Sequence, residues 1–264
     1  MPLTVTTDHD AIRALVDPLL AADPIRHTVL GTIGITLRDT AWAATDGTCL
    51  AVRSEAQFPL LLVGDWPADG RTELRALLTE LPGVAGLSGP EAQVTALLDV
   101  VGPRPRIERQ RLFRLTTLVE PAVAGRAIVA QDEHRSFGRA CVAAFAAEAH
   151  DTMTDTDPTA DRALDAGQLY LWLDPSGTPV SMAARRPVLA GSARVGPVYT
   201  PPEHRGHGYG SGVTAAATRS ILADGGIPVL FTDLANPTSN KIYQALGYYP
   251  VEDRIVASRS SQAA

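Results

Sequence analysis

One stretch of the sequence, VYTPPEHRGHGYGSG, gathers four glycines, an arginine and two histidines between Val198 and Gly212. A strand-like apolar run precedes it, and a long alanine-rich run typical of a helix follows it. Glycine loses more conformational entropy on folding than any other residue, so glycines at alternate positions indicate a need for bare backbone. Because a helix N-terminus offers unpaired N–H groups and a partial positive charge, the pattern suits the binding of phosphate.

Two common phosphate-binding loops do not fit this stretch. The P-loop requires a lysine after its second glycine, and the stretch contains no lysine. The dinucleotide fingerprint G-x-G-x-x-G would place Ser211 or Val213 where its last glycine belongs. The spacing that does fit is R-x-x-G-x-G, which is carried by Arg205, Gly208 and Gly210.

This spacing, between an apolar strand and a helix, resembles the signature of the GNAT acyltransferase superfamily. A second segment, NPTSNKIYQALGYYP (236–250), resembles a later motif of that superfamily: an asparagine, a helix that carries a tyrosine, then Leu-Gly-aromatic. The strands and helices expected over 126–260 also follow the order of that fold. The resemblance implies an α/β (α+β) fold for the C-terminal half, with a mixed central sheet flanked by helices.

The resemblance also implies that acetyl-CoA is a co-substrate and that no metal takes part. The N–H groups of the loop would surround the pyrophosphate, Arg205 would add charge or hold the loop, and the strand edge before it would pair with pantetheine. His204 and His207 lie three residues apart with no third ligand nearby, which favours a solvent-facing pair over a metal site. The residues expected to bind the cofactor are Val198, Tyr199, Thr200, Arg205, Gly206, His207, Gly208, Tyr209, Gly210, Ser211, Asn236 and Ser239.

Acetyl transfer in this superfamily is a direct attack by an uncharged amine on a thioester. The N–H of Val198 is the expected donor to the developing oxyanion. Tyr243 occupies the position of the general acid of the superfamily, and a phenol with a pKa of about 10 can protonate a thiolate whose pKa is about 8.5. Alternatively, Tyr243 is simply a packed aromatic residue of its helix.

The sequence does not identify the general base or the acceptor site. Glu133, Glu148 and Glu203 are candidates for the base by residue type alone, and water is another. Four aspartates lie in a polar break at 150–161, where they could attract a cationic amine or solvate a loop: Asp151, Asp155, Asp157 and Asp161.

The first half of the chain has the element order of the second. Its run from FPLLLVG to SGPEAQVTALLDV predicts strand, loop, helix, strand and helix, but its loop DWPADGRTEL lacks the arginine and the alternate glycines. We expect a smaller, degenerate GNAT-like α/β domain at 1–120 without a cofactor loop, a linker at 120–125, and a catalytic N-acetyltransferase domain at 126–264. An unrelated α/β domain is the alternative for the first half.

Composition narrows the class of partner. The 264-residue chain carries a net charge of −6, which disfavours nucleic acid as a partner. No apolar run approaches the roughly 18 residues that a membrane span needs, and no signal-peptide pattern opens the sequence, so we expect a cytoplasmic protein. Its two cysteines are expected to be reduced, and its bias toward arginine over lysine is typical of a GC-rich bacterial genome. Self-association as a homodimer is left open.

We therefore expect an acetyl-CoA-dependent N-acetyltransferase that acts on a primary amine of a small molecule or peptide. A non-catalytic coenzyme A sensor is one alternative. A Fem-type aminoacyl transferase is another, although such proteins usually need a basic surface for transfer RNA and lose the R-x-x-G-x-G loop.

Overall fold

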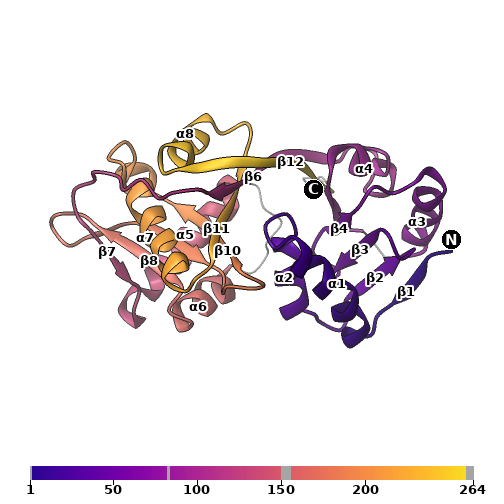
Figure 1. The fold of residues 1–264 in the computed structure, drawn as a ribbon. Helices are drawn as coiled ribbons and strands as arrows, with labels where there is room; N and C mark the ends of the chain where they lie inside the picture. Colours follow the sequence, from indigo (N-terminus) through magenta and orange to yellow (C-terminus); the bar gives the residue numbers. More distant parts are fainter. Residues whose placement is uncertain (1, 82–83, 150–155, 260–264) are drawn as a thin grey trace. The chain divides into compact units, whose positions relative to one another are not determined.

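The computed structural model describes residues 2–81, 84–149 and 156–259, which form two compact units (Figure 1). Unit 1 contains the described residues up to Leu112, Thr232–Asn236 and those from Val251 onward. Unit 2 contains Phe113–Phe231 and Pro237–Pro250. The C-terminal residues of the chain therefore group with its N-terminal half. No helix in the described residues is both long enough and apolar enough to cross a membrane.

Unit 1 is a sheet with helices on both faces. Its elements, in chain order, are β1 (Thr4–Thr6), α1 (His9–Ala22), α2 (Thr28–Ile35), β2 (Trp42–Thr45), β3 (Leu50–Arg53), β4 (Leu60–Val63), α3 (Ala68–Glu80), β5 (Gly86–Gly89), α4 (Glu91–Thr95) and the 3-10 turn η1 (Leu98–Val100). Strands β1 to β4 pair antiparallel in sequence order, and β4 pairs parallel with β5. The last strand of the chain, β12 (Tyr248–Ser258), pairs antiparallel with β5 through its C-terminal part.

The alternation of residues along β3 assigns its two faces. Leu50 and Val52 join the core made with α1 and α2, whereas Ala51 between them joins the core made with α3. Helix α1 begins directly after Asp8, whose side chain accepts a hydrogen bond from the N–H of Ala11 at 2.8 Å and so caps the helix.

The segment PEAQVTALLDVV differs from the prediction. It was expected to form one helix, but it forms the short α4 followed by η1. Leu97, between the two, has φ −122° and is fully buried. The backbone thus leaves the helical conformation at the residue whose side chain is buried in the core. Tertiary packing often overrides helix propensity in this way.

Unit 2 consists of a strand, helices, a three-stranded meander, a helix, a strand and a helix. Strand β6 (Arg106–Leu115) leads from unit 1 into unit 2. The elements that follow are β7 (Arg126–Val129), η2 (Asp132–His134), α5 (Arg135–Glu148), α6 (Asp157–Asp165), β8 (Leu169–Leu173), β9 (Pro179–Arg185), β10 (Ser192–Tyr199), η3 (Pro202–His204), α7 (Tyr209–Ala223), β11 (Ile227–Asp233) and α8 (Pro237–Ala245). Strands β7 to β10 pair antiparallel in order, and β10 pairs parallel with β11.

Two cores lie on opposite faces of this sheet. One contains residues of α5 and α6, such as Cys141 and Leu164, packed with Leu171 of β8. The other contains residues of α7, such as Ala217, packed with Tyr170 and Trp172 of the same strand. The mixed sheet flanked by helices confirms the predicted fold class.

Gly212 brings α7 close to β8. A Cβ at this position would lie 2.8 Å from two atoms of the Trp172 ring, closer than real Cβ contacts come. The indole N–H of Trp172 donates to the carbonyl of Ala124 at 2.9 Å, which fixes the ring in place. Gly212 is therefore a packing residue, and the 120–125 segment, expected to be a linker, is bonded to the core.

We predict that Gly212→Ala destabilises the protein. Its methyl group would push against a ring that a hydrogen bond to Ala124 holds in place, and overpacking of this kind costs about 1–3 kcal/mol. This loss outweighs the gain of up to about 1 kcal/mol that alanine brings to a helix. Urea unfolding followed by near-ultraviolet circular dichroism measures the change.

Gly34→Ala is the matched control, because Gly34 lies in α2 and its added Cβ would meet only Val16 at an ordinary 3.7 Å. That variant should be as stable as the parent or slightly more so. An unchanged urea midpoint for Gly212→Ala would contradict the packing role.

Candidate functional site

Strand β10 separates from β11 before it ends. Their parallel pairing extends from Ser192↔Ile227 to Arg194↔Val229. No pairing with β11 is found for the remaining described residues of β10, 195–199. The edge of β10 that faces β11 is therefore left without a strand partner over these residues.

A bulge in β10 accompanies this separation. The pairing of β10 with β9 shifts register between Val195 and Val198. The residues in between are Gly196, whose φ of +140° favours glycine, and Pro197, which has no N–H to donate. Pairing with β9 resumes at Val198↔Ala183, so β10 stays attached on that side only. A bulged strand with one open edge can accept an extended chain as an additional partner.

The loop after β10 presents a run of free backbone donors. Among the described residues, no acceptor is found for the N–H groups of 206–210, at the start of α7. The N–H of Ser211, expected to belong to this set, donates instead to the carbonyl of Gly208 at 2.9 Å. Gly206 and Gly208 have φ values of +82° and +80°, and turns with such residues form concave groups of N–H donors that bind anions.

The space around the glycines is uneven. A Cβ added to Gly206 would meet nothing within 4 Å, whereas one added to Gly208 would lie 3.2 Å from Val123. At Gly210 an added Cβ would lie 3.4 Å from the hydroxyl of Thr200. Two of these positions require positive φ, and Gly208 also requires a small residue because the 120–125 segment packs beside it.

Arg205 holds the loop in place. Its Nε donates to the carbonyl of Thr200 at 2.9 Å, and its Nη2 lies 2.8 Å from both carboxylate oxygens of Glu148, at the end of α5. The guanidinium lies over the ring of Tyr199, 5.5 Å from its centroid. Of the two roles left open for Arg205, its contacts support the fixing of the loop.

Glu148 is a positioning residue in this arrangement. It accepts from the hydroxyl of Tyr199 at 2.7 Å, and that bond, together with those from Arg205, lowers the pKa of its carboxyl group. A lowered pKa keeps the carboxylate charged at neutral pH, but its oxygens are already engaged, which disfavours it as a base. Burial and Glu148 raise the pKa of Tyr199 to about 12. Glu133 and Glu203, the other candidates, are exposed.

The two histidines of the loop contact their neighbours. The ring of His207 stacks on Tyr209, with centroids 5.3 Å apart and planes 14° apart. Its Nδ1 lies 3.3 Å from the carbonyl oxygen of His204. Within the described ranges, no group of three or more His, Cys, Asp or Glu is placed to hold a metal ion.

Tyr243 lies on α8 with its ring in the core. Only 9% of the residue is exposed, and its ring centroid lies 6.5 Å from that of Phe113 and 6.2 Å from that of Tyr248. Burial raises the pKa of its phenol to about 12, so the group is protonated at neutral pH. Ser239 lies one turn earlier on α8, and Asn236 lies directly before the helix. The roles expected of these residues stay predictions.

The polar break at 150–161 overlaps α6, and the two aspartates in the overlap are paired with arginines. Asp157 and Asp161 form ion pairs with Arg139 of α5, and Asp161 also pairs with Arg135. Bonds from Arg139 and Arg135 lower the pKa of Asp161 to about 2. These aspartates therefore join α6 to α5. Asp151 and Asp155 lie outside the described residues.

Cys141 is buried, and this raises the pKa of its thiol to about 12, so it is not a nucleophile at neutral pH.

Two features of unit 2 were not predicted from the sequence. One is the contact of Glu148 with Arg205, for which a separation of 57 residues gives no local signal. The other is a pocket lined by Arg162, Arg186 and the bulge residues Gly196 and Pro197. The adjacent Arg185 and Arg186 at the end of a strand were the only visible signal for it.

Comparison with known proteins gives this geometry a context. The sequence profile of the FR47-like protein family matches residues 176–256, which include the loop and α8. No curated protein matches the chain significantly.

Several solved structures share its fold. A GCN5-related N-acetyltransferase from Kribbella flavida is 18% identical, covers 92% of this chain and 97% of its own, and gives a TM-score of 0.63. A GNAT-family acetyltransferase from Colwellia psychrerythraea is 12% identical over 98% of this chain and 99% of its own, with a TM-score of 0.62. A tandem GNAT protein from the clavulanic acid biosynthesis pathway is 12% identical over 99% of this chain and 100% of its own, with a TM-score of 0.55. At these identities the likeness concerns the fold, and it extends along almost the whole chain. The chain therefore has the fold of these GNAT structures along almost its whole length, and its residues 176–256 match the FR47-like family.

Proposed function

We propose that the protein is an acetyl-CoA-dependent N-acetyltransferase whose acceptor is a primary amine of a small molecule or peptide. The observation that carries the proposal is the free N–H run of residues 206–210, placed directly after a strand with an open edge. The N–H run suits the pyrophosphate of coenzyme A, and the open strand edge suits its pantetheine arm.

The donors fit a diphosphate in kind and in place. Backbone N–H groups at a helix N-terminus bind anions, since the helix dipole adds a partial positive charge there. Gly206 and Gly208 supply the positive φ that turns these groups toward a common side. Arg205, held by Glu148 and Thr200, keeps the loop in this conformation before a ligand arrives.

Acetyl-CoA would supply the acetyl thioester, and the residues of unit 2 would supply position and protons. The N–H of Val198, directly after the bulge, is the proposed donor to the carbonyl oxygen of the acetyl group. The amine nitrogen forms a bond to the acetyl carbon, its surplus proton passes to water or to a base, and the bond to sulfur breaks. The phenol of Tyr243 gives its proton to the departing thiolate.

No equivalent cradle is found in the described residues of unit 1. In the first turn of α3, a Cβ on Gly70 would lie 3.3 Å from the ring of Pro67, and the N–H of Gly70 donates to the side chain of Asp69. The N–H of Arg71 donates to the carbonyl of Pro67 at 2.9 Å. We therefore propose one coenzyme A site per chain, in unit 2.

Gly208→Asp should weaken binding of acetyl-CoA at least about 100-fold, because it places bulk and a like charge beside the phosphates. Isothermal titration calorimetry measures the affinity, and the parent protein should give one site per chain. Gly177→Asp is a matched control: Gly177 also has a positive φ of +90°, and a Cβ there meets nothing within 4 Å. If both variants bind as the parent does, the loop assignment is wrong. If the parent itself does not bind, the proposed function fails.

Tyr243→Phe should lower kcat about 100-fold or more while the KM for acetyl-CoA changes little, since the phenol acts only in the transition state. With a phenol pKa of about 12, the rate of the parent should not fall through loss of this proton between pH 7 and pH 10. Tyr249→Phe is the control, because Tyr249 is 48% exposed. A fully active Tyr243→Phe variant would place the acid elsewhere. Tight coenzyme A binding by the parent without turnover of any amine would favour a sensor.

A further inference from the structure

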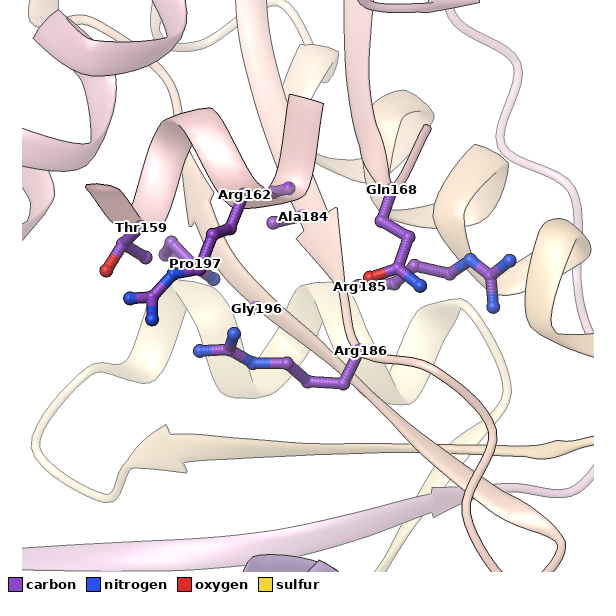
Figure 2. A pocket seen from close by; sticks show the side chains of 9 residues that line it. Thr159, Arg162, Gln168, Ala184, Arg185, Arg186, Gly196 and Pro197 are labelled. Carbon is purple, nitrogen blue, oxygen red and sulfur yellow. The ribbon is translucent and has the colours of Figure 1, made fainter. Parts of the chain in front are cut away.

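A pocket in unit 2 lies between α6 and the bulge of β10 (Figure 2). Its wall includes Thr159 and Arg162 of α6, Gln168 before β8, Arg186 after β9, and the bulge residues Gly196 and Pro197. Pro197 directly precedes Val198, the residue proposed to bind the carbonyl of the acetyl group. The pocket therefore borders the segment of β10 at which acetyl transfer is proposed to occur.

The charges in this wall are all of one sign. Three arginines line the pocket, and no aspartate or glutamate does. Arg185 is paired with Asp224, and Figure 2 shows its side chain running away from those of Arg162 and Arg186. The chain as a whole has a net charge of −6, yet every charged side chain of this pocket is positive.

Arg162 and Arg186 have no carboxylate partner among the described residues. The Nε of Arg162 donates to the carbonyl of Pro158 at 2.9 Å, which leaves the rest of its guanidinium available. No hydrogen bond or ion pair is found for the guanidinium of Arg186 within the described residues. In Figure 2 both side chains extend to the same side of the pocket, beside Gly196 and Pro197.

The aspartates of α6, the helix that lines the pocket, are already paired with arginines. Asp157, Asp161 and Asp165 of α6 pair with arginines of α5, at Nη–carboxylate distances of 2.5–3.4 Å. Those pairs leave no carboxylate of the described part of α6 to neutralise Arg162 or Arg186.

An unpaired arginine beside a second one is unfavourable in a partly buried place. Burial, and then the charge of Arg162, lower the pKa of Arg186 below its ordinary value. A guanidinium stays charged even so, and burying it without a counter-ion costs free energy that a bound anion would return. Two planar guanidinium groups are also the side chains best suited to bind a carboxylate with two parallel hydrogen bonds.

We propose that the acceptor amine also carries a carboxylate, and that Arg162 and Arg186 bind this carboxylate in the pocket. The acceptor is then a free amino acid or a close relative of one, with its amine directed toward the thioester. The hydroxyl of Thr159 and the amide of Gln168 offer neutral hydrogen-bonding groups in the same wall. This inference rests on the proposed function, whose acceptor it narrows.

Matched ligand pairs test the proposal by direct binding. Calorimetry at low ionic strength compares L-alanine with ethylamine, L-leucine with isopentylamine, and L-phenylalanine with phenethylamine, with and without coenzyme A. The amino acid should bind at least about tenfold more tightly than its amine in at least one pair, since a hydrogen bond to a charged group contributes about 1.5–3 kcal/mol. Equal affinity within every pair would overturn the proposal. Tighter binding of phosphoethanolamine than of every amino acid would replace the carboxylate with a phosphate, and so overturn it too.

Variants connect the effect to the two arginines. Arg162→Gln and Arg186→Gln should each weaken amino acid binding about tenfold or more while the affinity for coenzyme A stays unchanged. Arg219→Gln is the control, since Arg219 lies on α7 and pairs with Glu120. Arg162 is exposed, so its variant should fold even if Arg186→Gln does not. Unaltered amino acid binding in Arg162→Gln would contradict the proposal.

The two proposals can fail separately. If coenzyme A binds and amines are acetylated without preference for a carboxylate, the function stands and the inference falls. If amino acids bind through the arginines but coenzyme A does not bind, carboxylate binding in the pocket is supported and the proposed function is wrong.

Discussion

The loss of pairing between β10 and β11 after Arg194 is the constraint on which the candidate site depends. A parallel pair that continued to Tyr199 would use the backbone groups of β10 on both edges. Because the pair stops and the bulge at 196–197 keeps β10 attached to β9, one edge stays open in the middle of a sheet. The same strand then runs into the loop whose N–H groups are also unused. Two sets of unpaired donors and acceptors thus follow each other along one short segment.

Contacts from distant parts of unit 2 keep this segment rigid. Glu148 at the end of α5 holds Arg205. The ring of Trp172 in β8 packs against Gly212, and its N–H donates to the carbonyl of Ala124. Val123 packs beside Gly208 from the same stretch as Ala124. The loop is therefore held from three directions before any ligand is present. A binding site that is already ordered loses little conformational entropy on binding, which favours affinity.

The sequence predicted the local features well and the long-range ones poorly. Strand and helix patterns and the glycine spacing are local, and the resemblance that implied the fold class rests on them. The role of Gly212 depends on Trp172, and the role of Arg205 depends on Glu148, and neither pair is close in sequence. The aspartates of α6 were weighed as free charges because nothing local shows that arginines of α5 bind them. The arginine pocket likewise depends on long-range contacts, since Arg162 lies in α6 and Arg186 follows β9.

Strand β12 has a consequence for the biogenesis of the chain. Its first residues, Tyr248–Pro250, belong to unit 2, whereas its later ones pair with β5 of unit 1. During translation β5 is made long before β12, the strand that pairs with its free edge. Until then β5 has an unpaired edge, which is a site for wrong pairing with other strands. A gene split near residue 120 would place β5 and β12 on separate chains. The N-terminal piece would then lack the strand that pairs with β5.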